Sequence, residues 1–201
     1  MQDRRWHYLK PNARGRRPTV MIFVACHAVR KESVDLSVEY EVKAGSAIFM
    51  RRRTKNGHEW YHEERHEFDT AEGFWDWVES KSRPSWTLHI IAYSWELEGC
   101  LLDAAMELET RGWHAYRYMA EERKTIIRLV DGKRKLVLLS LTNWFEQPLE
   151  ELATTTQIPP LWVYQENGDP RPEWAEAMRR SRVIAVTFTQ LLEFVRDHEL
   201  G

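Results

Sequence analysis

Apolar residues follow two different periods along this chain, and the change of period predicts both strands and helices. The unbroken apolar run Val20–Ala25 is typical of a strand inside a sheet that is covered on both faces, and Trp86–Ala92 is a second predicted buried strand. Asn56-Gly57 and Asp131-Gly132 are hairpin-turn signals, and each joins two extended segments. We therefore predict strands over Val20–Ala25, Val38–Arg53 with a break at Gly45, His58–Phe68, Trp86–Ala92, Trp113–Met119, Thr125–Val130 and Lys135–Leu139.

Between these segments, apolar residues recur every three or four positions, as they do on one face of a helix. Thr70 and Ser94 are suitable N-cap residues, and Gly112 suits the position just beyond a helix end. We predict helices over 70–82, 94–112, Pro148–Ala153 and 173–200, with a loop over Thr154–Pro172. The helix after Ser94 is expected to bury Leu97, Leu101, Ala104, Ala105 and Leu108. This order predicts one α/β domain in which helices flank a mixed sheet.

The size and charge of the chain limit its functions. Its 201 residues suffice for one domain with a substantial core, which we place at 18–201. Residues 1–17 form an irregular arm that is rich in basic residues, and it is either a solvated tail or a phosphate-binding arm. Because the net charge is −2, any binding of nucleic acid must use local basic patches.

Cysteine and tryptophan usage adds further expectations. With only Cys26 and Cys100, neither a disulfide framework nor a zinc ribbon can form, and their apolar surroundings predict small buried side chains rather than reactive thiols. No apolar run is long enough to span a membrane and no secretory signal pattern opens the chain, so we expect a cytoplasmic protein. Ten tryptophans is a high number, and any that the core leaves exposed would favour an interface with a protein partner or a second copy.

Four segments carry a resemblance to a known family through their order and spacing. They are the strand segment Val20–His27, the strand-to-helix segment Ala92–Glu98, the segment Leu138–Phe145 and the helical segment Arg179–Val183. The first, second and fourth resemble the three motifs of DnaQ-like (DEDD) 3′–5′ exonucleases, in the form carried by family B DNA polymerases. The resemblance covers residues 20–201, and it implies a ribonuclease H-like fold with a mixed sheet flanked by helices.

Most of the family's metal-binding acids are replaced in this chain. The resemblance places Ala25 and His27 at the Asp and Glu of the first motif, Glu98 at the Asp of the second, and Ser181 at the Asp of the third. Cleavage by two metal ions needs hard oxygen ligands around cations about 3.5–4 Å apart. One carboxylate and one histidine do not supply that cluster, so we expect a catalytically degenerate domain without a cofactor. His27 and Glu98 are the weak candidates for a single metal ion.

Basic residues flank the third motif and crowd two predicted hairpins. They are Arg51, Arg52, Arg53, Lys55, Lys133, Arg134, Lys135, Arg179, Arg180 and Arg182. If they converge in space, their contacts with phosphate would let the domain hold nucleic acid without cutting it. The alternative is that each basic run is a solvated surface, balanced by the 31 acidic residues of the chain.

The segment His58–His62 matches, letter by letter, the His-Glu-x-x-His pattern of zinc metalloproteases. That pattern binds zinc only on a helix, where both histidines lie on one face. Here it follows the Asn56-Gly57 turn signal and contains aromatic residues that favour strands, so we predict a strand and no protease. His58, His62 and His66 would then share one strand face, which leaves a surface metal site as an alternative.

These features lead to one functional hypothesis and two alternatives. We expect a pseudo-exonuclease that binds nucleic acid or serves as a structural subunit of a nucleic-acid-processing complex. The first alternative is an active 3′–5′ exonuclease that holds Mg²⁺ or Mn²⁺ with a rearranged ligand set around His27 and Glu98. The second is a protein–protein interaction module without affinity for nucleic acid.

Overall fold

The computed structural model describes residues 17–32, 38–121, 124–159 and 171–198. The predicted basic arm lies outside this part of the chain except for Arg17, and so does most of the predicted loop before the last helix. The strands are β1 (Val20–Glu32), β2 (Val38–Lys55), β3 (His58–Phe68), β4 (Thr87–Ala92), β5 (His114–Glu121), β6 (Lys124–Asp131) and β7 (Arg134–Ser140). The helices are α1 (Ala71–Lys81), α2 (Trp95–Leu101), α3 (Ala104–Thr110), α4 (Leu149–Thr155) and α6 (Pro172–Asp197), with a 3₁₀ turn η1 (Leu141–Asn143).

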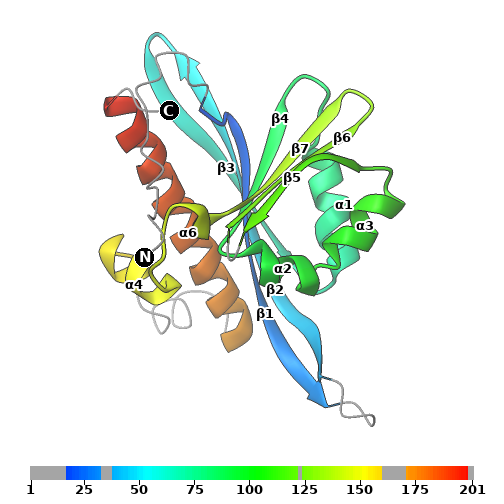
Figure 1. The fold of residues 1–201 in the computed structure, drawn as a ribbon. Coiled ribbons are helices and arrows are strands. Elements are labelled where there is room, and N and C mark those ends of the chain that lie inside the picture. The colour runs from blue at the N-terminus through cyan, green and yellow to red at the C-terminus, as the bar shows by residue number, and fades with distance from the viewer. Residues whose placement is uncertain (1–16, 33–37, 122–123, 160–170, 199–201) are drawn as a thin grey trace, which may run out of the picture.

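All the described strands form one seven-stranded sheet, in the order β3-β2-β1-β4-β7-β6-β5 (Figure 1). Strands β1, β2 and β3 pair antiparallel, whereas β1, β4 and β7 run parallel to one another. The β5–β6 hairpin extends the sheet antiparallel to β7. This arrangement confirms the predicted α/β class with a mixed sheet flanked by helices, and its strand order is compatible with a ribonuclease H-like fold.

The parallel strands give the sheet two distinct ends. We call the end where β1, β4 and β7 stop the carboxyl end, and the end where they start the amino end. In open sheets of this kind, functional residues usually lie beyond the carboxyl ends of the parallel strands. The start of α2 lies at the carboxyl end, because α2 follows β4 after two residues.

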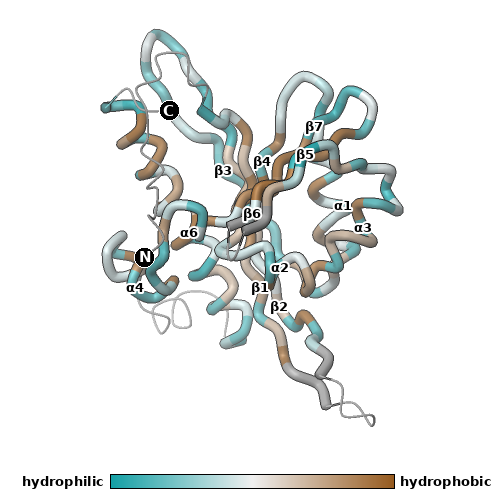
Figure 2. Tube along the Cα trace, viewed as in Figure 1, coloured by the Kyte–Doolittle hydropathy of each residue, from teal (hydrophilic) through white to brown (hydrophobic). Residues whose placement is uncertain are grey.

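Alternate residues of β1 enter two separate hydrophobic cores, as expected for a strand covered on both faces. Ile22 and Val24 pack with residues of α1, α2 and α3, whereas Met21 and Phe23 pack with residues of α4 and α6. Figure 2 shows hydrophobic residues along the middle of the sheet and hydrophilic residues on the β2–β3 hairpin. Within the described part of the chain, no helix combines the length and the apolar character needed to cross a membrane.

The predicted hairpin turn is confirmed, but the predicted break at Gly45 is not. Asn56 and Gly57 both have positive φ angles, 54° and 79°, as a tight turn between right-twisted strands requires. Strand β2 continues through Gly45, where the ring of Phe68 lies against the backbone. A Cβ atom at position 45 would lie only 2.1 Å from the Phe68 Cε2 atom, so this close approach explains the glycine.

The prediction of one continuous helix over 94–112 is wrong, because this segment forms two short helices. Asp103, with φ 46°, adopts a left-handed conformation between α2 and α3. The carbonyl of Leu102 instead accepts a hydrogen bond of 2.7 Å from the Trp75 indole of α1. As a result, Leu97 is 48 % exposed and Ala105 is also exposed, although both were expected in the core.

Candidate functional site

The positions that correspond to the exonuclease motifs meet at the carboxyl end of the sheet, beneath α6. Ala25 of β1 packs in the core that α6 covers, and it pairs with Ser46 of β2. The Oγ atom of Ser46 lies 3.1 Å from the Oγ atom of Ser181 on α6, and both residues are buried. Glu98 reaches α6 from α2 through an ion pair with Arg180. The structure therefore gathers the motif positions in one place.

Arg180 is the central charged residue of this site. One guanidinium nitrogen donates a hydrogen bond of 2.8 Å to the carbonyl of Cys26, in the middle of β1. The other lies 3.6 Å from a carboxylate oxygen of Glu98, whose side chain is only 1 % exposed. A protein cation thus lies between the first-motif strand and the one carboxylate that the resemblance retains.

Glu98 is an unusual carboxylate because it is buried with few polar contacts to offset the loss of water. Neither of its carboxylate oxygens accepts a hydrogen bond from the described residues. Burial raises the pKa of Glu98, and the nearby Arg180 guanidinium lowers it by less. The carboxyl group therefore keeps its proton to a higher pH than an exposed glutamate does, which weakens it as a metal ligand.

His27 is held by an acid that the sequence patterns did not single out. Its Nδ1 atom lies 3.0 Å from a carboxylate oxygen of Glu176 on α6, and both side chains are partly exposed. Glu176 lies one helical turn before Arg180, so these two residues face the middle of β1 together. Their spacing of four was a usable signal, but only the packing of α6 on β1 identifies their partners.

These residues do not fit a pair of magnesium ions. Magnesium prefers several oxygen ligands in octahedral geometry, whereas Ala25 has none and Ser181 is hydrogen bonded to Ser46. Glu98 is paired with Arg180, and His27 is paired with Glu176. Across the described ranges, no group of three or more His, Cys, Asp and Glu side chains is placed to hold a metal ion.

The two cysteines differ, and the prediction for one of them is wrong. Cys26 is buried in the core on the face opposite α6, and burial raises the pKa of its thiol well above the usual range. It is therefore not a nucleophile that His27 could activate. Cys100 is exposed, since the separate short helix α2 carries it on the surface rather than into the core.

The basic residues near the third motif are engaged within the protein. Arg179 forms a two-pronged pair with Glu150 of α4, at 2.8 and 2.7 Å, and its hydrogen bonds lower the pKa of Glu150. Arg182 donates a hydrogen bond of 2.7 Å to Glu63 of β3. Together with Arg180, these arginines connect α6 to its neighbours, so they offer little charge to an external phosphate.

A second group of predicted basic residues lies at the amino end of the sheet. The β2 residues 51–55 and Trp60 of β3 line a hollow of about 500 Å³. Arg51, Arg53 and Lys55 share one strand face because they are spaced by two, and Arg53 pairs directly with Trp60 across the hairpin. Arg53 and Lys55 are exposed, and they form no ion pair with any described residue. We call this hollow the basic hollow.

The β6–β7 hairpin brings its own lysines to the same end of the sheet. Lys133 and Lys135 are exposed, whereas Arg134 forms ion pairs with Glu79 and Asp131 and stacks on Trp113. Lys135 lies on β7, three strands away from β2 in the sheet, and at the usual strand spacing this lateral distance is about 14 Å. Arg52 pairs with Glu59, and Arg51 stacks on Trp86. The predicted basic residues that remain exposed at this end are Arg53, Lys55, Lys133 and Lys135.

The His-Glu-x-x-His segment lies on strand β3, as predicted, and not on a helix. His66 stacks on Trp77 of α1 with ring centroids 4.7 Å apart, and burial lowers the pKa of His66. Its packing inside the protein explains this histidine without a ligand. The strand assignment removes the geometry that a zinc protease needs.

Three comparisons with known proteins complete the description of the site. No protein-family model, no curated protein and no solved structure was found to match the chain. The resemblance to DnaQ-like exonucleases therefore stays a prediction from the sequence motifs. What the structure adds is the sheet topology and the meeting of the motif positions beneath α6.

Proposed function

We propose that this protein is a non-catalytic, exonuclease-like domain that binds nucleic acid through the basic hollow at the amino end of its sheet. The observation that carries the proposal is the Arg180–Glu98 pair, which puts an internal cation beside the one retained carboxylate. Free basic residues are found instead at the opposite end of the sheet.

The ion pair argues against a metal-dependent reaction at the motif positions. A divalent cation bound by Glu98 would lie close to the Arg180 guanidinium, and like charges at such distances repel strongly in a partly buried site. Moving Arg180 away would also break its hydrogen bond to the Cys26 carbonyl. The alternative of an active exonuclease built on His27 and Glu98 would need both of their present partners to be displaced.

The basic hollow supports a role in holding single-stranded nucleic acid. Phosphate contacts dominate the affinity of such complexes, and Arg53 and Lys55 supply exposed positive charge. Trp60 is 45 % exposed beside them, and an exposed aromatic ring offers a stacking surface for a base. Charge and stacking together are the two contributions that single-strand binding uses.

The proposal is tested by fluorescence anisotropy with labelled single-stranded DNA and RNA over a range of salt concentrations. We expect binding that weakens as salt increases. The Arg53→Ala/Lys55→Ala variant should lower the steepness of the salt dependence by about 1.4, because each single-strand phosphate contact contributes about 0.7. The matched control is Arg117→Ala/Arg128→Ala, which removes two exposed cations from β5 and β6 and should leave the salt dependence unchanged.

The same samples, incubated with Mg²⁺ or Mn²⁺, test the absence of catalysis. We expect the labelled strands to keep their length. Shortening that disappears in Glu98→Gln would show an active exonuclease and contradict the proposal. An absence of salt-dependent binding would contradict the nucleic-acid part and favour a protein-interaction module.

A further inference from the structure

A concave surface lies on the face of the sheet opposite α6. It is a hollow of about 760 Å³ between helices α2 and α3 on one side and strands β5, β6 and β7 on the other. Its deep residues are apolar and include Leu108, Leu129 and Leu138, and the rings of Trp95 and Trp113 contribute to its walls. Nothing in the degenerate motif site or the basic hollow uses this surface, which we call the apolar groove.

Acidic residues surround the apolar groove. Glu96 of α2, Asp103 between the helices and Glu109 of α3 line it and are exposed, and no lysine or arginine lines it. One histidine, His114, also lines the groove. A ligand that fills the groove therefore meets apolar side chains at the bottom and negative charge at the rim.

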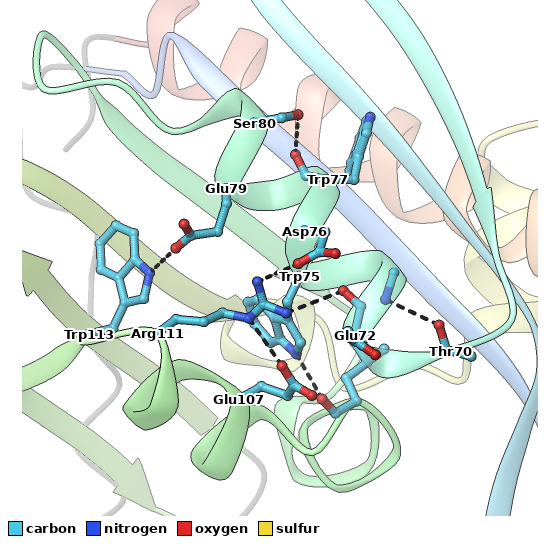
Figure 3. A network of polar contacts seen from close by, with 12 residues as sticks. Thr70, Glu72, Trp75, Asp76, Trp77, Glu79, Ser80, Glu107, Arg111 and Trp113 are labelled. Atoms are coloured by element: carbon cyan, nitrogen blue, oxygen red, sulfur yellow. Dashed lines mark hydrogen bonds and ion pairs between the residues drawn. The ribbon is translucent and has the colours of Figure 1, made fainter.

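The walls of the groove are fixed by contacts between α1 and α3 (Figure 3). Arg111, just after α3, donates hydrogen bonds to Asp76 of α1 at 2.6 Å and to Glu107 of α3 at 3.0 Å. The Trp113 indole donates to Glu79 at 2.8 Å, and the Trp75 indole holds the carbonyl before Asp103. Because these contacts exist without a ligand, binding needs little reorganisation, which favours affinity.

We propose that the apolar groove is a docking site for a cationic amphipathic helix of a partner protein. Leucine-type side chains spaced along one helix face would fill the apolar bottom, and lysine or arginine on the flanks would meet the acidic rim. This charge complementarity excludes nucleic acid as the occupant, since its phosphates would face Glu96, Asp103 and Glu109. The inference is independent of nucleic-acid binding, which uses different residues.

Cys100 provides a direct reporter of occupancy, because it is exposed and lines the groove. The probe is a synthetic amphipathic helix of leucine and lysine about four turns long, and the matched probe has glutamate in place of lysine. The rate at which Cys100 reacts with a thiol reagent is measured as peptide is added. Cys26 serves as the internal reference, since it is buried and should react only on unfolding.

We expect the lysine peptide to slow the reaction of Cys100 in a saturable manner and the glutamate peptide to leave it unchanged. The variant Glu96→Gln/Asp103→Asn/Glu109→Gln should weaken the lysine peptide about tenfold. The control variant Asp69→Asn/Glu146→Gln/Glu151→Gln removes three exposed acids elsewhere and should bind as the wild type does. Ala105→Trp, which fills the groove from its α3 wall, should abolish protection.

Other outcomes overturn the inference. If the rim variant and its control bind the lysine peptide equally weakly, the peptide is held by non-specific charge attraction. Protection by both peptides alike would mean that the acidic rim has no role. Slowing of the Cys100 reaction with protein concentration alone would identify a second copy of the chain, rather than a cationic helix, as the occupant.

Discussion

At the scale of single residues, the most consequential contact is the buried pair of Glu98 and Arg180. A buried ion pair is a weak source of net stability, because desolvation of the charges offsets their attraction. Breaking it by removing one partner is costly, since the other charge stays buried. This asymmetry makes the role of Arg180 measurable, and it distinguishes an internal counter-charge from a surface arginine.

Arg180→Met should lower the free energy of unfolding by about 3 kcal/mol or more at pH 8, because Glu98 loses its counter-charge. The loss should shrink at pH 5, where Glu98 can take up a proton instead. The double variant Arg180→Met/Glu98→Gln should recover most of the loss in urea unfolding. Arg196→Met, on the exposed end of the same helix, is the control and should leave the urea midpoint unchanged. A loss that is equal in the single and double variants would argue against the pairing.

The pH dependence of stability offers a separate check on Glu98. Burial raises its pKa above that of the unfolded chain, so the folded protein holds a proton in a pH window where the unfolded chain has released it. Stability contributed by this group is therefore present below about pH 4.3 and is lost as the pH rises through the folded pKa. Relative to wild type, Glu98→Gln should become progressively more stable as the pH rises from 4 to 8. Glu146→Gln, at an exposed position, should follow the wild-type curve, and a parallel curve for Glu98→Gln would refute the shift.

At the scale of secondary-structure elements, local patterns predicted most of what the structure shows. The apolar runs, the Asn56-Gly57 turn and the long last helix are set by residues close in sequence, and the structure has them all. The helix after Ser94 was predicted as one because its apolar spacing is helical throughout. Its division at Asp103 depends on Trp75, which lies 27 residues away and binds the Leu102 carbonyl.

The candidate site was less predictable than the fold for the same reason. Motif spacing selected Ala25, Glu98 and Ser181, and it assigned Arg180 to an external phosphate, whereas in the structure Arg180 pairs with Glu98. The partners of His27 and Glu98 come from α6, which begins about 80 residues after the start of α2 in the sequence. No local pattern shows which charges will meet across such a separation.

Substitutions at two glycines test the backbone conformations of the β2–β3 turn and of α2. Gly57→Ala should lower the free energy of unfolding by about 1 kcal/mol, because a φ of 79° is a left-handed conformation that is strained for a residue with a Cβ atom, although the space around that atom is open. Gly99→Ala in α2 should instead raise it by about 0.5–1 kcal/mol, since its new Cβ would meet only Trp95 at 3.6 Å. Urea unfolding of the two variants measures both effects, and a shift of the same sign in both would contradict the assigned conformations.

At the scale of the whole molecule, the sheet separates surfaces of opposite charge. The basic hollow lies at the amino end of the sheet on β2 and β3, whereas the acidic rim lies on α2 and α3, over the face of the sheet opposite α6. A chain whose net charge is only −2 can therefore present a local positive surface and a local negative one.

This separation has a measurable consequence for nucleic-acid binding. Neutralising the acidic rim with Glu96→Gln/Asp103→Asn/Glu109→Gln should leave the affinity for single-stranded DNA within about twofold at 0.15 M salt, where the Debye length is about 8 Å. At about 0.01 M salt, where that length is about 30 Å, the same variant should bind DNA more tightly. Anisotropy titrations at the two salt concentrations make the comparison. A large effect at the higher salt concentration would show that the acidic rim and the basic hollow are one continuous surface.

Manganese binding tests whether an internal arginine takes the place of metal ions at the motif positions. Electron paramagnetic resonance measures free Mn²⁺ in the presence of the 201-residue chain at pH 7.5. We expect free Mn²⁺ to equal total Mn²⁺ up to protein concentrations of about a millimolar. Depletion of free Mn²⁺ by close to two ions per chain, abolished by Glu98→Gln, would contradict this expectation.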